Sequence, residues 1–388
     1  MKTAVIISEY NPFHFGHKYH IEQTRKLGAT HIIAVMSGNI VQRGDVAIYD
    51  KHMRAECAVR NGCDLVLELP YPYSCSSAER FARGGVAIAN GIGITDMLSF
   101  GSENGDVSVL RQAAEATITL EKSEEVRRLI GSGISYPKAV FEAAKGIISD
   151  EALECLSSPN NTLAIEYIKA LNSIDSKITP VTIKRTGAGH DESFIDGKFT
   201  SASNIRSMIS ENSDFSKYIP ELISQPHRCL ENMASSIIFE LSRKTAYELS
   251  KAPDITSELA QRIIMVLRKL PTSFNALADG VKSKNFTHSR IRRALLSSYF
   301  GITTDDFSAV PYARVLAMGC KGGELLSAIS KSSNGFSVSA SLAELSRISP
   351  LHNRIAQLDE ITSRFANMCG CESVPYNSEF LFRLKPCD

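Results

Sequence analysis

Two histidines near the start of the chain have the spacing of an anion-binding loop. His14, Gly16 and His17 form the pattern H-x-G-H, which follows the apolar run Val5–Ile7 and precedes a helix-permissive stretch, 18–27. A glycine lets the backbone approach a phosphate closely, and imidazole nitrogens can donate hydrogen bonds to phosphate oxygens. The N–H groups at a helix start add a partial positive charge. The pattern therefore predicts a phosphate site between a first strand and a first helix.

A second candidate anion site lies in the segment Phe199–Met208, which reads FTSASNIRSM. Either Ser201 or Ser203 can cap a helix here, and Arg206 falls near its start. Hydroxyl groups, backbone N–H groups and a guanidinium at a helix start can surround a tetrahedral anion. A capped helix that binds nothing is the simpler interpretation. Two such helix starts in one α/β domain favour a nucleoside triphosphate as the ligand.

The elements that must position these residues alternate along the first half of the chain. Apolar runs that end at glycine, proline or asparagine predict strands, and the stretches between them predict helices. This alternation predicts an α/β fold with a parallel, Rossmann-like sheet, in which ligands lie at the carboxyl ends of the strands. The predicted strands are 5–7, 30–36, 64–69, 95–100 and 178–185, and the predicted helices are 18–27, 49–61 and 76–90, with further helix over 121–171.

Two more loops are expected at the same edge of this sheet. The loop Ser37–Gly44 carries Arg43, which either belongs to an ordinary polar surface loop or faces the same crevice as the histidines. Gly101 follows the fourth predicted strand and would allow close approach of a base or a ribose. The predicted crevice can therefore draw on the loops that follow several strands.

Composition excludes several classes of protein. The 388 residues are enough for two or three domains, and 43% hydrophobic and 22% charged residues are ordinary for a globular protein. Nine cysteines at irregular spacing indicate reduced thiols, and Cys369-Gly-Cys371 is too short and isolated a pair for zinc, so no metal site is predicted. No stretch resembles a signal peptide or a membrane span. These features predict a cytoplasmic protein with no membrane partner.

A basic segment in the second half is a candidate nucleic-acid contact. The formal net charge of +1 means that any basic surface must be local, and Val281–Ile302 contains five cations and no acid. Aromatic side chains at 286, 288, 299 and 300 are candidates for stacking on unpaired bases. Basic residues at a helix start oppose its dipole, which a bound polyanion would relieve. A solvated helix face is the simpler interpretation. The five cations are Lys282, Lys284, Arg290, Arg292 and Arg293.

The division of the chain follows from where the strand signals end. Residues 1–215 form the predicted nucleotide-binding catalytic domain, and 216–388 form a mainly helical region for RNA binding. Beyond Pro311 the pattern predicts further helices and a serine-rich stretch that has no chemical signature. The expected architecture is therefore an α/β sheet domain followed by a mainly α-helical C-terminal domain.

The two anion motifs together resemble the nucleotidylyltransferase superfamily. Additional segments narrow the resemblance to one bacterial family, the tRNA(Met) cytidine acetate ligases. The likeness runs in distinct motifs through residues 1–210 and more loosely to about 330. The matching segments are E-Y-N-P-F-H-x-G-H, M-S-G-N-x-x-Q-R-G, D-x-x-x-E-L-P, F-G-S-E, S-P-N-N-x-L and the segment before Gly187.

The resemblance implies a two-step reaction on a sheet domain of the HIGH nucleotidylyltransferase type. Acetate and ATP would give acetyl-adenylate and pyrophosphate. The exocyclic amine of the wobble cytidine in elongator tRNA(Met) would then attack the acetyl carbonyl and yield N(4)-acetylcytidine. The implied partners are ATP, acetate and tRNA. Physical reasoning adds Mg²⁺ between phosphate oxygens, and it requires no covalent nucleophile, so the cysteines receive no catalytic role.

The ATP contacts of that family carry over onto the opening loop and a few later positions. His14, His17 and Arg206 are the candidate catalytic residues, because donors aimed at a departing pyrophosphate stabilise the transition state. The resemblance leaves Asn160 and Asn161 as alternatives. The predicted ATP-binding residues are Ile7, Ser8, Glu9, Tyr10, Asn11, Pro12, Phe13, His14, Phe15, Gly16, His17, Lys18, Tyr19, His20, Gly101, Asn160, Asn161, Arg185, Ser201 and Ser203.

Two other functions stay open at this point. A nucleotidylyltransferase for a small phosphorylated metabolite would explain both anion motifs but not the basic helical region. A nucleotide-regulated RNA-binding protein without catalysis would explain the basic segment but would leave the phosphate site idle. An acetyl-CoA-dependent enzyme is disfavoured, because the chain shows no R/Q-x-x-G-x-G/A loop. Lys18 can equally be a solvated lysine, Glu9 receives no role of its own, and the oligomeric state is left open.

Overall fold

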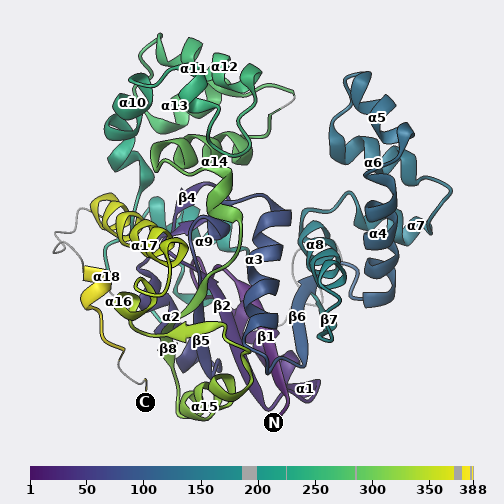
Figure 1. The fold of residues 1–388 in the computed structure, drawn as a ribbon, viewed down its shortest axis with the longest axis vertical. Coiled ribbons are helices and arrows are strands. Elements are labelled where there is room, and N and C mark those ends of the chain that lie inside the picture. Colours follow the sequence, from purple (N-terminus) through teal and green to yellow (C-terminus); the bar gives the residue numbers. More distant parts are fainter. Residues whose placement is uncertain (186–198, 224, 285, 371–377, 385–386, 388) are drawn as a thin grey trace.

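A seven-stranded sheet in the order β7-β6-β1-β2-β5-β8-β9 forms the centre of the computed structural model (Figure 1). The structure describes residues 1–185, 199–223, 225–284, 286–370, 378–384 and 387, and only the backbone of 159 and 160. Strands β7, β6, β1, β2 and β5 are mutually parallel. They lie at the five predicted positions, which confirms the α/β prediction. Their bounds are Thr179–Lys184, Met97–Ser102, Thr3–Ser8, His31–Ser37 and Leu65–Leu69, in that order.

Helices cover both faces of the sheet, which explains why its central strands β1 and β2 are apolar along most of their length. Successive side chains of a strand point to opposite faces. Val5 therefore packs in one core cluster, whereas Ala4 and Ile6 pack in another. The Ala4 side is covered by α1 (Phe15–Lys26) and α2 (Lys51–Arg60), and the Val5 side by α3 (Ala78–Gly91), α8 (Pro159–Ser173) and α15 (Gly322–Ser332).

The chain returns to the sheet after the helical region. β8 (Tyr312–Met318) pairs antiparallel with β5, and β9 (Ser337–Ser339) pairs parallel with β8. The prediction of helices alone beyond Pro311 is therefore wrong for these stretches. Arg314 interrupts the apolar run of β8, and a charge in a buried run argues against a strand. Here it is fully buried, and its Nη1 lies 2.5 Å from the Glu379 carboxylate. The division of the chain at residue 215 stays a prediction.

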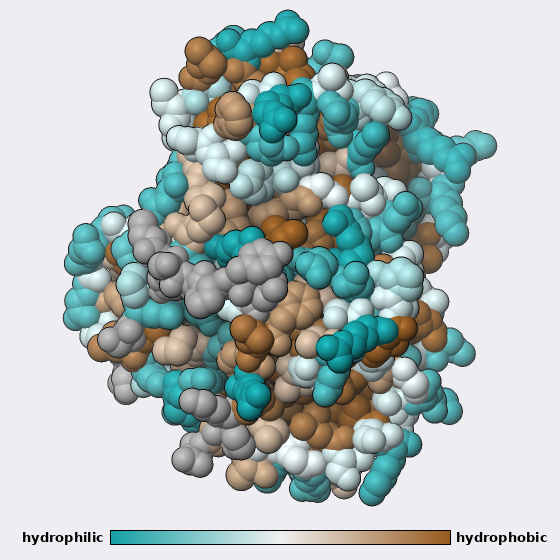
Figure 2. All heavy atoms as spheres, turned by 60° about the vertical axis from the view of Figure 1, so that its left-hand side comes forward, coloured by the Kyte–Doolittle hydropathy of each residue, from teal (hydrophilic) through white to brown (hydrophobic). Residues whose placement is uncertain are grey.

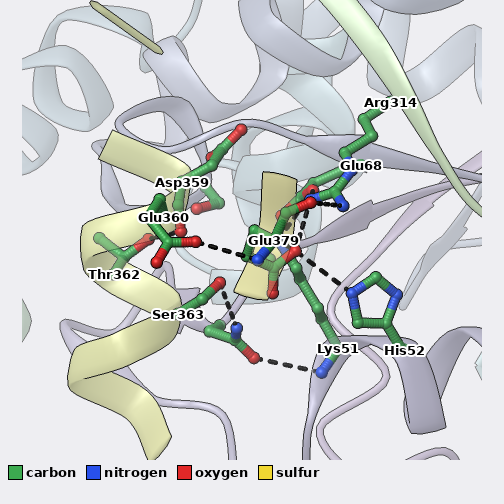
Figure 3. A network of polar contacts seen from close by, with 12 residues as sticks. Lys51, His52, Glu68, Arg314, Asp359, Glu360, Thr362, Ser363 and Glu379 are labelled. Atoms are coloured by element: carbon green, nitrogen blue, oxygen red, sulfur yellow. Dashed lines mark hydrogen bonds and ion pairs between the residues drawn. The ribbon is translucent and has the colours of Figure 1, made fainter. Parts of the chain in front are cut away.

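A network of buried charges joins the sheet to the C-terminal helices (Figure 3). Lys51 Nζ lies 2.8 Å from the carboxylate of Glu68 on β5 and 3.2 Å from that of Glu379. Burial alone would raise the pKa of Glu379, but Lys51 and other neighbouring cations hold it well below its usual range. Burial and the charge of Glu68 raise the pKa of Asp359, on α17, to about 8. Charges are tolerated in a core only when they are compensated in this way.

A small helical lobe stands beside α8, at the right of Figure 1. It has a hydrophobic core of its own, centred on residues such as Leu120, Val126 and Val140. Ser123 and Ser149 cap two of its helices by accepting a hydrogen bond from a backbone N–H of the first turn. The helices are α4 (Val107–Leu120), α5 (Glu124–Gly131), α6 (Tyr136–Ala144) and α7 (Asp150–Cys155).

A helical unit, α10 to α14, lies above the carboxyl ends of the parallel strands (Figure 1). Its core is continuous with residues of α17, among them Leu358 and Phe365. Thr287 caps α14 by accepting a hydrogen bond from Arg290 N at 3.4 Å. The remaining helices are α9 (Ala202–Ser210), α10 (Ala234–Ser242), α11 (Ala246–Leu249), α12 (Ser257–Leu267), α13 (Phe274–Val281), α14 (His288–Tyr299), α16 (Leu342–Leu345), α17 (Pro350–Cys369) and α18 (Ser378–Leu381).

Short elements complete the fold. A two-stranded hairpin, β3 (Ile40–Val41) and β4 (Asp45–Val46), occupies the loop after β2 that was expected to be irregular. No helix among the described residues is long and apolar enough to cross a membrane. The 3₁₀ turns are η1 (Tyr73–Cys75), η2 (Ser216–Tyr218), η3 (Leu230–Met233) and η4 (Thr304–Phe307).

Candidate active site

The two histidines of the H-x-G-H pattern lie where the chain passes from β1 into α1, with His14 just before the helix and His17 in its first turn. His14 is the N-cap residue of α1, and its Nδ1 accepts a hydrogen bond from Gly16 N at 3.0 Å. His17 Nδ1 accepts one from His14 N at 3.2 Å. Because each Nδ1 is an acceptor, each neutral ring carries its proton on Nε2. The backbone therefore prepares two Nε2–H donors, with the rings stacked 3.8 Å apart.

Gly16 has a structural role beside the close approach to phosphate, which stays a prediction. A Cβ atom at this position would lie 2.8 Å from Cε1 and 2.9 Å from Nδ1 of His14. Any larger side chain would push the His14 ring away from the Gly16 N–H that orients it. The glycine thus keeps the first histidine in place.

Both histidines are neutral at physiological pH. Burial, followed by the charges of Arg185 and Arg206, lowers the pKa of His14 to about 4. Burial and the neighbouring ring of His14 lower the pKa of His17 well below its usual range. The positive charge of the site therefore comes from the two arginines, while the imidazoles act as neutral donors.

Arg206 brings the second anion motif to the first. Ser201, rather than Ser203, caps α9 by accepting a hydrogen bond from Asn204 N at 3.1 Å. Arg206, in that helix, donates to the carbonyl oxygen of Asn11 at 2.7 Å. The side chain of Asn11 in turn accepts from a backbone N–H of the segment before α2. The two predicted anion sites therefore meet at the loop after β1.

Glu9 and the hairpin loop belong to the same site. Glu9 Oε1 accepts a hydrogen bond from Gln42 N at 2.8 Å. Burial raises the pKa of this carboxyl, and the charges of Arg206 and Arg43 act against that rise. Arg43 also affects the pKa of Arg206. Arg43 is therefore near Glu9 and Arg206, but its side chain is exposed, so both interpretations of Ser37–Gly44 stay open.

Arg54 on α2 is a functional residue that the sequence did not suggest. Its guanidinium donates to the carbonyl oxygens of Glu9 at 2.5 Å, Ser37 at 3.2 Å and Gly38 at 2.5 Å. Its Nε donates to the Tyr49 carbonyl oxygen at 3.1 Å. Burial lowers the pKa of Arg54 to about 10, which still leaves it charged at neutral pH. One side chain thus fixes the ends of β1 and β2 relative to each other.

The loop after β6 provides the next part of the site. Arg185 N donates to the Ser102 carbonyl at 2.9 Å, and the aliphatic part of its side chain lies over Gly101. Asn161 is buried, and its Oδ1 accepts a hydrogen bond from Glu103 N at 2.9 Å. The Asn160 side chain and residues 186–198 lie outside the described residues, whereas the part of the segment before Gly187 that ends at Arg185 is described. Of the two asparagines, Asn161 is therefore the one seen to hold this loop.

Other residues of the opening loop form the framework around the histidines. Tyr10 and Phe13 are buried, with ring centroids 4.9 Å and 5.5 Å from that of His17. His20 Nε2 lies 2.9 Å from Ser99 Oγ, which turns this histidine towards β6. The predicted ATP contacts of the whole loop, Ile7 to His20, stay a prediction.

The basic segment divides into two groups. Arg292 donates to the Gly44 carbonyl at 3.0 Å and to Asp45 at 2.8 Å, and Arg293 donates to the Gln42 carbonyl at 3.1 Å. These two join α14 to the β3–β4 hairpin. Lys282 and Lys284 are exposed, whereas Arg290 binds the carbonyl group of Asp254 at 3.0 Å.

The aromatic side chains of this segment do not form a platform for bases. Phe286 is buried, and the rings of Tyr299 and Phe300 lie 5.4 Å and 5.1 Å from that of Phe365. The expectation of stacking on unpaired bases is wrong for these three rings, because they pack in or against the hydrophobic core, and it stays a prediction for the half-exposed His288. The predicted RNA contacts of the five cations stay a prediction.

Comparisons with known proteins agree with this geometry. Residues 1–369 match the HIGH Nucleotidyl Transferase family. A tRNA(Met) cytidine acetate ligase of Clostridium kluyveri is 37% identical over 363 residues, which cover 86% of this chain and 88% of that protein. One of Clostridium novyi is 34% identical over 402 residues and covers 98% of each chain. The crystal structure of Thermotoga maritima TmcAL bound with alpha-thio ATP covers 100% of both chains, with a TM-score of 0.89 at 29% identity.

Proposed function

Because the chain belongs to the HIGH nucleotidyl transferase family and, within it, to the tRNA(Met) cytidine acetate ligases, we propose that it makes acetyl-adenylate from acetate and ATP. The acetyl group then passes to the wobble cytidine of elongator tRNA(Met) and gives N(4)-acetylcytidine. One observation carries the proposal. The backbone presets His14 and His17 as neutral Nε2–H donors, in the electrostatic reach of Arg185 and Arg206.

In the first step, an acetate oxygen attacks the α-phosphorus of ATP, and the bond from that phosphorus to the bridging oxygen of pyrophosphate breaks. Two anions must approach each other, so the positive charges of Arg185 and Arg206 offset their repulsion. Negative charge develops on the leaving pyrophosphate, where the two imidazole N–H groups donate. Removing one preorganised donor of this kind costs about 2.7–4 kcal/mol of transition-state stabilisation.

In the second step, the exocyclic amine of the cytidine attacks the acetyl carbonyl carbon. The carbon–oxygen bond to AMP breaks, AMP leaves with the electron pair, and the new amide loses a proton to solvent. The protein's part in this step is to hold the adenylate and the base together, which replaces a bimolecular encounter by a local one.

We also propose that Mg²⁺ accompanies ATP. Among the described residues, no group of three or more His, Cys, Asp or Glu side chains is arranged to hold a metal ion. Mg²⁺ in nucleotide sites is held largely by phosphate oxygens and water, so a protein cage is not needed. When bound, the ion would offset part of the triphosphate charge, and the roles of the histidines and arginines stay as described.

The RNA contacts proposed for the basic segment differ in kind. Lys282 and Lys284 are exposed and suited to phosphate contacts. Arg290 lies with its guanidinium carbon 5.1 Å from the centroid of the Phe286 ring. The contacts of Arg292 and Arg293 favour a role in holding α14 over the site. Residues 216–388 would thus bind tRNA in the cytoplasm, and residues 1–215 would bind ATP and acetate.

The decisive experiment supplies the protein with ATP, Mg²⁺, radiolabelled acetate and an elongator tRNA(Met) transcript. We expect ATP-dependent label in the RNA, released on nuclease digestion as N(4)-acetylcytidine. A transcript with uridine at the wobble position is the control, because it lacks the exocyclic amine. Pyrophosphate release without labelled RNA would point to a nucleotidylyltransferase for another substrate. If neither pyrophosphate nor labelled RNA is formed, the enzyme assignment is overturned.

A further inference from the structure

The helical unit concentrates the positive charge of the chain. Residues 234–302 contain eleven lysines and arginines against five acids, whereas the whole chain has 43 and 42. The segment therefore carries a net charge of +6, and the rest of the chain carries −5. A local excess of this size favours a polyanion as partner.

Several of these cations are already used inside the protein. Arg292 and Arg293 bind the β3–β4 hairpin. Arg262 donates to two carbonyl groups at the end of α13, at 3.1 Å and 3.0 Å, and Lys244 donates to a carbonyl group near the end of α14. These four side chains join helices to each other or to the hairpin. A polyanion must therefore bind to the remaining cations of the unit.

Four of the remaining cations share one surface. Arg268 and Lys269 directly follow α12, and Lys282 and Lys284 follow α13; all four are exposed. Arg262, on α12, reaches the Lys282 carbonyl, so the residues after α13 lie beside the last turns of α12. Within the described part of the chain, none of these four side chains has an ion-pair or hydrogen-bond partner.

Apolar side chains lie exposed among these cations. Met265 is 60% exposed and Leu270 is 80% exposed. Figure 2 shows another face of the molecule, on which apolar and hydrophilic side chains of the helical unit lie side by side at the top. The one acid of α12, Glu258, is at the opposite end of the helix, and Asp279 on α13 is engaged 3.0 Å from His288. The surface is therefore cationic, with an apolar part suited to ribose and base edges.

We infer that the RNA contact proposed for Lys282 and Lys284 extends over α12, and that this α12 surface binds the phosphate backbone of the tRNA at a distance from the reacting cytidine. The surface is formed by Met265, Arg268, Lys269, Leu270, Lys282 and Lys284. The inference rests on the proposed function, which names the RNA. α12 packs against α10, α11 and α13, and Figure 1 places it at the end of the molecule opposite the N-terminus. The α12 surface would bind a double-helical stem of the tRNA while the wobble base enters the site at the loop after β1.

Charge reversal at the end of α12 tests this surface. We expect R268E/K269E to reduce the slope of log affinity against log salt by about 2, since each lost phosphate contact removes about 1. Affinity for the tRNA at low salt should fall about tenfold or more. The matched control is K331E/R347E, which reverses two exposed cations outside the helical unit. Lys331 lies in α15, and Arg347 follows α16. Its binding should stay within about twofold of the unmodified protein.

Three readouts separate the outcomes. The proposed surface is contradicted if R268E/K269E leaves the tRNA affinity and its salt slope unchanged. It is also contradicted if the control K331E/R347E loses as much tRNA affinity. The neutral pair R268Q/K269Q should give a smaller loss in the same direction, which excludes misfolding of the reversed variant as the cause. Pyrophosphate release without tRNA should be unaltered in all variants. Because tRNA binding is measured directly, the two proposals can fail separately. A tRNA that binds as expected but is never acetylated would contradict the proposed function and still support the RNA-binding surface.

Discussion

The position of one proton decides what each site histidine can do. In both His14 and His17, Nδ1 accepts a hydrogen bond from a backbone N–H, so the proton is on Nε2, which is left as the donor. Burial keeps both rings neutral. A neutral donor binds a phosphate oxygen without adding a positive charge. Such a charge would attract the pyrophosphate and oppose its departure. The arginines, which are always charged, supply the long-range attraction.

Replacing His17 by Ala removes one of these donors. We expect acetate-dependent pyrophosphate release to fall about 10²–10³-fold, the usual cost of one preorganised donor. Binding of tRNA, measured by the same salt titration as above, should be unchanged because the ring lies in the first turn of α1, outside the helical unit. H227A is the control, since His227 is exposed outside the site. Equal loss in both variants would show that the ring has no special role.

The lowered pKa values also predict the pH profile of the first step. With a pKa of about 4, His14 stays neutral as pH falls from about 7.5 to 5.5 and becomes charged only near pH 4. Acetate-dependent pyrophosphate release should therefore show no histidine inflection across that range. Initial rates in a constant-ionic-strength buffer series measure this. An inflection near pH 6.5 would mean that a site histidine titrates normally.

The elements of the sheet depend on one side chain that crosses between them. Arg54 of α2 binds carbonyl groups at the ends of β1 and β2, the two strands whose loops form the predicted phosphate site. A buried carbonyl group that loses its partner costs about 1–3 kcal/mol. The loop geometry therefore depends on α2 although α2 contributes no group to the predicted nucleotide contacts.

We expect R54M to lower the free energy of unfolding by about 3 kcal/mol or more, because several carbonyl groups lose their donor. It should also lower the rate of pyrophosphate release at saturating ATP. R60M is the matched control on the same helix, because Arg60 forms a partly exposed pair with Glu221 at 2.7 Å and should cost less than about 1 kcal/mol. Urea unfolding of both variants measures the difference; similar losses would remove the special role of Arg54.

The sequence predicted the elements whose signals are local. The central parallel strands are visible because burial on both faces makes them short, mainly apolar runs, whereas the half-buried edge strand β7 shows only its β-branched residues. The helix starts at Ser201 and Thr287 follow from capping chemistry. β8 was missed because Arg314 interrupts its run, and the compensating Glu379 is distant in the chain. Arg54 was missed because its partners are backbone carbonyls, which every residue has, so no pattern of residue types reveals them.

At the scale of the whole molecule, the helical unit and the sheet are joined close to the site. Arg292 lies on α14 and binds Gly44 and Asp45 of the hairpin loop, whose Gln42 N–H binds Glu9. A side chain at Gly44 would lie 2.6 Å from Arg293 N, so the contact is also tightly packed. RNA held by the helical unit is therefore positioned relative to the loop after β1.

R292A tests whether this contact positions the RNA or binds it. Because the guanidinium is occupied by the hairpin and Asn275, we expect the salt slope of tRNA binding to stay the same. Acetyl transfer to bound tRNA should fall, since α14 is no longer fixed over the site. K282A is the comparison, with the slope reduced by about 1 and transfer at saturating tRNA unchanged. A reduced slope in R292A would instead assign it a phosphate contact.

The pairing of β5 with β8 has a consequence for the order in which the protein is made. β5 ends at Leu69, but the strand that covers its edge begins only at Tyr312. During synthesis from the N-terminus, the growing chain exposes an apolar, unpaired strand edge until the C-terminal part has left the ribosome. Contacts between such distant residues also form slowly. The newly made chain is thus open to edge-to-edge aggregation from the synthesis of β5 until that of β8.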